Sequence, residues 1–262
     1  RSMGFEFDEV PRHWMAGLAV PTAMANALNL IFPLGERFFV RSVRHYLSAL
    51  DDDPELREQV KGFFGQEGRH AHEHERLFAA LEAQGFDIRP FLARYDAIAY
   101  KRLEPLFGPK MRLSVTVALE HYTAILAENA FHYHLLDRAH PSVRALLAWH
   151  AAEEIEHKAV AFDVLKKVDP SYRLRVAGMA LATAVLVGFW ALGTAALLRQ
   201  EPGLRPREVL RQFVALQREN PLGRRVFFRG LREYLRPGFH PWQNDNLALA
   251  RDYLASVGRA VA

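Results

Sequence analysis

One arrangement of glutamate and histidine occurs twice in this chain and sets the strongest limit on its fold. In each copy a lone glutamate is followed, 31 or 34 positions later, by the motif Glu-x-x-His. The first copy contains Glu36, Glu67 and His70, and the second contains Glu120, Glu154 and His157. Residues three apart on a helix project from the same side. Each motif therefore predicts a helix that presents one carboxylate and one imidazole together.

Helix-breaking residues lie about midway between the lone glutamate and the motif of each copy, at 51–54 and at 140–142. A turn at that place makes an antiparallel helix pair whose two glutamates come to the same level. Two such hairpins packed face to face would bring four carboxylates and two imidazoles into one bundle core. A single Glu-x-x-His is common on solvated helix faces. Two copies, each with a centred turn, favour a metal site over satisfied surface and core polar groups.

The expected elements form an all-α chain. We expect bundle helices over about 34–50, 54–84, 110–137 and 142–168, and a long crossover over 85–109, which contains three prolines and Gly108. The uncharged stretch 14–34 is expected to be buried under the bundle, with a membrane or partner contact as the alternative. Further helices are expected over 176–198, 206–220, 222–235 and 245–257. The prediction is a four-helix bundle, a hydrophobic fifth helix and C-terminal helices.

His150 adds a third nitrogen ligand to the predicted site. It lies four residues before Glu154 on the same helix face, while Phe63 holds the equivalent position in the first copy. The predicted site is therefore asymmetric. His74 stacks one turn beyond His70, so it is either an extra ligand, a group that orients a ligand, or a plain core histidine.

Three acidic residues near the expected ligands receive other interpretations. Glu128 lies two turns after Glu120 and is expected to hold a ligand in place. Glu153 and Glu156 fall on other faces of the fourth helix and are expected to be solvated.

Composition limits the kind of metal and the compartment. The chain has no cysteine, which excludes disulfides, thiolate zinc sites and iron–sulfur clusters and favours a cytoplasmic location. A site of oxygen and nitrogen ligands suits iron or manganese. We assign residues 1–2 to a cloning scar ahead of Met3, 3–170 to the metal-binding bundle, 171–199 to the hydrophobic helix and 200–262 to a basic helical extension.

The basic charge is confined to the end of the chain. From Arg199 onward there are twelve arginines, no lysine and six acids, a local charge of +6, so the rest of the chain carries about −2 of the net +4. That distribution, without an interleaved aromatic and basic motif, argues against nucleic-acid binding. Residues 176–198 carry no charge over 23 positions and are long enough to cross a bilayer, or to form a buried helix or a homodimer interface. A location in the cytoplasm or at the cytoplasmic membrane follows.

With these residues in hand, the chain resembles the ferritin-like di-iron carboxylate proteins. The extension of the second motif by His150 is similar to the seven-ligand site of the arylamine N-oxygenases. The whole pattern, including the apolar segment after the bundle and the Pro-Gly-Phe-His-Pro-Trp sequence at 237–242, resembles a bacterial family described as a predicted metal-dependent hydrolase.

This resemblance and the ligand types lead to a functional expectation. The chain is expected to be an O2-activating oxygenase or oxidase with two Fe ions, or with Mn or a mixed Mn/Fe pair, bound by the seven residues. It would act on a small or lipid-like substrate and need an electron donor. The first alternative is a metal-dependent hydrolase that uses a water bridging the two metals. The second is a non-enzymatic, membrane-associated metal-binding protein.

Overall fold

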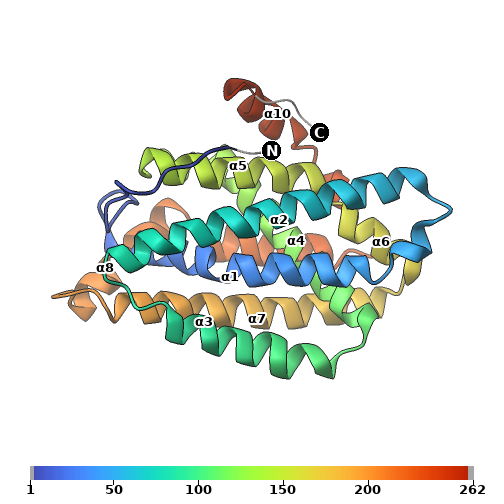
Figure 1. Cartoon of the computed structure of the whole chain (residues 1–262), viewed down its shortest axis with the longest axis horizontal. Helices are drawn as coiled ribbons and strands as arrows, with labels where there is room; N and C mark the ends of the chain where they lie inside the picture. The colour runs from blue at the N-terminus through green and yellow to red at the C-terminus, as the bar shows by residue number, and fades with distance from the viewer. Residues whose placement is uncertain (1–2, 259–262) are drawn as a thin grey trace.

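A computed structural model describes residues 3–258 and shows an all-helical protein, as predicted (Figure 1). Four helices lie at the centre and place the predicted ligands: α1 (Ala19–Arg44), α2 (Pro54–Ala83), α4 (Pro109–His132) and α5 (Pro141–His157). α1 packs against α2, and α4 packs against α5. The two pairs also contact each other, α1 with α4 and α2 with α5. The residues of the expected cloning scar, 1–2, lie outside the described part of the chain.

The ends of these helices follow from local sequence. α2 starts at Pro54, and the Asp53 side chain accepts a hydrogen bond from the backbone N–H of Leu56 at 3.1 Å, which caps the helix. α1 starts fifteen residues earlier than the expected position 34, at Ala19, and includes Pro33. The uncharged stretch before Leu34 is therefore mostly part of this helix. The fourth bundle helix is interrupted directly after His157 and resumes as α6 (Val160–Val168).

The connection between the two hairpins is the long crossover that the sequence predicted. It contains α3 (Arg89–Tyr95), the π-helical turn η2 (Asp96–Leu103) and the short 3-10 turn η3 (Glu104–Leu106). α3 contacts both α1 and α7 (Tyr172–Leu198). Its aromatic side chains, Phe91 and Tyr95, are buried. The crossover therefore closes the bundle on the α1 side.

The apolar segment 176–198 forms most of α7, which lies along the bundle (Figure 1) and packs against α1 and α4. Gly178 allows close contact with Ser114, and the indole N–H of Trp190 donates to the carbonyl of Met24 at 2.8 Å. The opposite face exposes apolar residues, including Val187 and Leu192. By length and composition α7 could cross a membrane, and only 28% of its most apolar stretch is buried. Packing on the bundle and an outward apolar face thus coexist.

The C-terminal part wraps the open sides of the bundle. It comprises α8 (Pro206–Glu219), η4 (Gly223–Phe228), α9 (Arg229–Tyr234), η5 (Pro241–Gln243) and α10 (Leu247–Ser256). α8 packs on α1, and α10 packs on α5. Lys158, the residue after the predicted ligand His157, donates to Asn246 Oδ1 at 2.6 Å and lies 4.4 Å from the ring centroid of Trp242. The aromatic loop at 237–242 therefore fixes the break between α5 and α6.

Candidate metal centre

The structure brings all seven predicted ligands together in the core. Each is at least 95% buried; they are Glu36, Glu67, His70, Glu120, His150, Glu154 and His157. α1 and α4 supply one glutamate each, α2 supplies a glutamate and a histidine, and α5 supplies a glutamate and two histidines. The helix pairing predicted from the sequence places residues that are up to 121 positions apart in one cluster.

Three groups within the cluster have ligand-type atoms that all lie within 4.8 Å of one another. They are Glu67, Glu120 and His157; Glu67, His70 and Glu154; and Glu36, His70 and His150. Glu67 and His70 each occur in two groups. The arrangement therefore has room for more than one cation, with shared ligands between neighbouring positions.

Three of the four carboxylates in the cluster have no hydrogen-bond partner although other ligand-type atoms lie close to them. Nε2 of His157 lies 3.0 Å from Glu67 Oε1 and 3.4 Å from Glu120 Oε2. Neither oxygen of Glu36, Glu67 or Glu120 has a hydrogen-bond partner. Ligands about 2.1 Å from one octahedral ion are about 3 Å apart, so these spacings are those of groups that converge on a cation. Buried carboxylates without partners are strongly disfavoured unless a metal or a proton neutralises them. The donor set therefore fits divalent metal ions of the oxygen- and nitrogen-binding type.

Glu153 orients His70, which the sequence interpretation did not foresee. The Glu153 side chain is fully buried, and its Oε2 accepts a hydrogen bond from Nε2 of His70 at 3.1 Å. This leaves Nδ1 of His70, which has no hydrogen-bond partner, turned toward Glu67 and Glu154 at 3.8 and 3.7 Å. The expectation that Glu153 is solvated was wrong. A carboxylate bound to the remote nitrogen of a ligand histidine fixes its tautomer and increases its basicity.

His157 is oriented by an amide. Its Nδ1 lies 3.1 Å from Oε1 of Gln66, whose Nε2 donates to Glu156 Oε2 at 3.1 Å. Because the amide nitrogen is used by Glu156, the amide oxygen accepts from Nδ1–H of His157. Nε2 of His157 is thereby turned toward Glu67 and Glu120. Burial opposes protonation of this imidazole, but Glu154 and Glu120 outweigh it and hold the pKa of His157 well above its usual value, so a metal must displace the Nε2 proton. Glu156, expected to be solvated, is partly exposed and also belongs to this hydrogen-bonded chain.

His150 is oriented by the histidine that was assigned three alternative roles. Nε2 of His74 lies 2.6 Å from Nδ1 of His150, and Nδ1 of His74 lies 2.7 Å from Oδ1 of Asn29. The amide nitrogen of Asn29 donates to the Ala25 carbonyl, so its oxygen faces His74. When His74 donates to Asn29 and accepts from His150, the Nε2 lone pair of His150 points at Glu154 Oε1, 2.9 Å away, with Glu36 Oε1 at 3.7 Å. These are the spacings of groups that share a cation. The contacts thus favour the orienting role for His74.

Burial and mutual repulsion set the protonation of the metal-free cluster. Burial, together with the neighbouring carboxylates, raises the pKa of Glu36 and of Glu120 well above the usual value, and burial raises the pKa of Glu67 to about 6. Burial opposes ionisation of Glu154 as well, but His157 and His150 outweigh it and hold the pKa of this carboxyl well below its usual range. Burial lowers the pKa of His70 to about 3. A neutral His70 is the form that binds metal.

Comparison with known families agrees with a metal-dependent activity. A family model described as a predicted metal-dependent hydrolase matches residues 1–245. The chain belongs to this family. Comparisons with curated proteins and with solved structures gave no match. Metal dependence is therefore the shared property of the family and the cluster, while the relationship to ferritin-like proteins stays a prediction.

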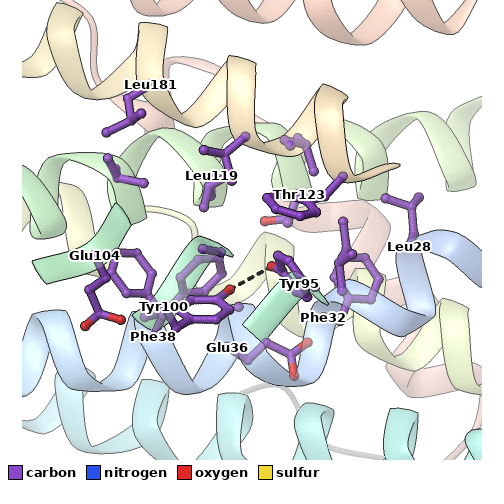
Figure 2. Close-up of a pocket in the computed structure, with 18 of the residues that line it drawn as sticks. Leu28, Phe32, Glu36, Phe38, Tyr95, Tyr100, Glu104, Leu119, Thr123 and Leu181 are labelled. Atoms are coloured by element: carbon purple, nitrogen blue, oxygen red, sulfur yellow. Dashed lines mark hydrogen bonds between the residues drawn. The ribbon is translucent and has the colours of Figure 1, made fainter. Parts of the chain in front are cut away.

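In this member of the family, an apolar cavity of about 90 Å³ adjoins the cluster at Glu36, His150 and Glu154. Figure 2 shows Glu36 beside the aromatic residues of the cavity wall. Its walls come from α1, α4, α7 and the crossover. Two phenol groups on the crossover, Tyr95 and Tyr100, share a hydrogen bond of 2.7 Å inside it. Burial raises the pKa of Tyr95 to about 12, so this phenol stays protonated at neutral pH. The cavity therefore gives the centre a mostly apolar neighbourhood that contains this pair of phenols.

Glu128, the other residue expected to hold a ligand in place, has different partners. Its carboxylate accepts hydrogen bonds from Arg229 at 2.7 and 3.2 Å and from the Asn246 side chain at 3.1 Å. Both partners belong to the C-terminal part of the chain. Glu128 thus ties α4 to that part, and these contacts give no support to a role beside Glu120.

Proposed function

We propose that this protein is a metal-dependent enzyme whose cluster of four glutamates and three histidines holds a pair of divalent cations next to an apolar substrate site. The observation that carries this proposal is the convergence of unpartnered buried atoms: both oxygens of Glu36, Glu67 and Glu120. Removing four carboxyl groups from water has a large free-energy cost. A bundle that offers three of these carboxyl groups no hydrogen-bond partner, yet orients three imidazoles toward the cluster, is built for cations.

Hydrolysis is the reaction that the family description supports. Bound divalent cations supply a water of lowered pKa as nucleophile, and iron supplies reactivity toward O2 in addition. The chain's own residues would determine which chemistry follows. Glu154, whose pKa is low, stays ionised and is the fixed anion of the site. Thr123 donates a hydrogen bond to its Oε2, which keeps that carboxylate in place at the wall of the apolar cavity.

O2-dependent oxidation is the second candidate, favoured by the ligand types and by the apolar cavity. Four carboxylates with neutral imidazoles suit iron or manganese, and the cavity beside Glu36 and His150 gives the centre a mostly apolar wall. An electron donor would then be required. The two candidates differ in what they consume, since hydrolysis needs neither O2 nor a reductant.

Metal analysis and activity assays on the full chain test the proposal and separate the candidates. We expect two transition-metal ions per chain in the purified protein, and about none in His157→Ala. His132→Ala, which changes an exposed histidine at the end of α4, is the matched control and should retain both. Hydrolysis of medium-chain p-nitrophenyl esters without O2, with Mn or Zn, would establish the hydrolase. Substrate-dependent O2 uptake with iron and a reductant would establish the oxidase. A wild-type protein that binds no metal would contradict both.

A further inference from the structure

A second and larger cavity, of about 610 Å³, reaches the same centre from the other end of the bundle. It lies between the first half of α1, the second half of α4, α5 and α8. Sites for small molecules typically occupy about 300–1,000 Å³. The two cavities share a short list of lining residues: Leu28, Phe32, Thr123, Leu126, His150 and Glu154. They therefore meet at the predicted metal ligands His150 and Glu154.

Small side chains create most of this space. Six alanines line the cavity: Ala16 ahead of α1, Ala25 on α1, Ala127 and Ala130 on α4, Ala151 on α5 and Ala215 on α8. Larger apolar residues, including Met24, Leu147 and Trp190, complete the wall. Such a wall receives a hydrocarbon chain favourably because both surfaces leave water.

The far end of the cavity carries a fixed cation. Nη1 of Arg225 donates to Oδ1 of Asn220 at 3.0 Å, and its guanidinium carbon lies 3.6 Å from the ring centroid of Tyr133. Arg138, also in the lining, has its nearest carboxylate oxygen, on Glu219, at the limiting distance of 4.0 Å. In the part of the chain that the structure describes, Arg225 forms no ion pair. A preorganised guanidinium without an acidic partner is suited to bind an anionic group with two hydrogen bonds.

The spacing between the two ends follows from α4. Thr123 contacts Glu154 at the metal centre, and Tyr133, which caps α4, contacts Arg225. Thr123 and Tyr133 are ten positions apart, which corresponds to about 15 Å along the helix axis. A ligand that spans the cavity must therefore be elongated, with unlike ends.

We propose that this cavity binds an amphipathic molecule with a medium-length hydrocarbon chain. Its anionic head, a carboxylate or a phosphate monoester, binds Arg225, and its apolar end reaches His150 and Glu154. This assignment rests on the proposed function, for which it names the substrate class. The bond that reacts then lies near the apolar end, remote from the charged group.

Direct binding measurements on the metal-loaded full chain test the assignment without requiring turnover. Dodecanoate, dodecyl phosphate and the uncharged dodecanol are titrated below their micelle concentrations, by calorimetry or by displacement of a fluorescent probe. Arg225→Gln keeps a hydrogen-bonding group beside Asn220 but removes the charge. Arg224→Gln changes the exposed neighbouring arginine and is the matched control. Ala130→Phe fills the cavity without changing a predicted ligand, and the melting temperature and metal content of every variant are measured in parallel.

We expect the two anions to bind at least about tenfold more tightly than dodecanol, because a charge-assisted hydrogen-bond pair favours them. Arg225→Gln should abolish that preference, and Arg224→Gln should preserve it. Ala130→Phe should weaken the binding of all three ligands. The tighter of the two anions identifies the head group. Equal binding of anions and alcohol by the wild type, an unchanged preference in Arg225→Gln, or no binding would overturn the assignment. A wild-type protein that binds the anions but holds no metal would instead refute the proposed function and leave the assignment of the cavity standing.

Discussion

The substitution Glu67→Gln should have opposite effects on the stability of the metal-free and the metal-loaded protein. The Glu67 side chain is fully buried, and burial raises its pKa from the usual value of 4.5 to about 6 in the folded state. A raised carboxyl pKa favours the folded state below pH 4.5, and this contribution is lost as the pH rises through 6. At pH 7 ionised Glu67 therefore destabilises the metal-free fold.

The size of the effect follows from the shift. A difference of about 1.5 units corresponds to about 2 kcal/mol in the free energy of unfolding. Glutamine has nearly the same shape and no charge, and His157 retains Glu120 and Glu154 as neighbours. We therefore expect metal-free Glu67→Gln to gain up to about 2 kcal/mol, or about 4–8 °C in melting temperature.

Bound metal should make the wild type more stable than Glu67→Gln, the reverse of the order in the metal-free state. A metal that binds only the folded state adds about 2.7 kcal/mol at a hundredfold excess over its dissociation constant. Glutamine removes a shared anionic ligand, so metal should stabilise the variant much less than the wild type. Thermal unfolding followed by circular dichroism, with chelator and with added metal, measures both differences. Glu58→Gln, on the exposed side of α2, is the control and should change neither. Equal destabilisation of Glu67→Gln in both states would show that Glu67 is a structural carboxylate, and would refute the reasoning.

Three further predictions concern the surroundings of the centre. Glu153→Gln should lower the metal affinity about 10–100-fold, because His70 loses the carboxylate that fixes its tautomer. A competition titration with a chelating dye measures this affinity, and an unchanged value would contradict the prediction. Metal binding should release protons at pH 7 and should weaken as the pH falls below about 6, because the raised carboxyl pKa values favour protonation. Calorimetry in buffers of different ionisation enthalpy measures the proton release. The same heat of binding in every buffer would mean that the carboxylates were already ionised. Gly178→Ala should lower the free energy of unfolding by about 1–3 kcal/mol, because the new Cβ would lie 2.7 Å from the Ser114 carbonyl carbon. Gly188→Ala, with open space around it, should be neutral or slightly stabilising, and equal effects of the two would mean that α7 leaves the bundle.

The local spacing of polar residues in the sequence was enough to predict which side chains meet. Glu67 and His70 must share a face of any helix that contains them, and a turn at 51–54 must place Glu36 opposite Glu67. These relations depend only on helix geometry and chain connectivity. They hold before any tertiary contact is known, which is why all seven proposed ligands are found in one buried cluster.

The sequence could not show in the same way whether the other faces of these helices, which point away from the hairpin partner, are buried or exposed to solvent. Glu153 is adjacent to Glu154 and points to another side of α5, so the sequence interpretation placed it in water. In the structure α2 brings His70 to that side, and α10 packs against the same helix. Helical periodicity gives the direction of a side chain, but only the neighbouring helices decide whether that direction leads to solvent or to a ligand.

The apolar segment 176–198 illustrates the same division. Its length and lack of charge determine a long helix, and they fit a bilayer and a protein core equally well. Only the structure places one face of α7 on α1 and α4, through the close approach at Gly178, and leaves the other face outward. By itself the sequence determined the helices and the identity of the metal-type side chains, because both follow from interactions a few residues apart. The tertiary structure decided which faces are buried, how each histidine is oriented and where the two cavities lie, because these depend on contacts between segments far apart in the chain.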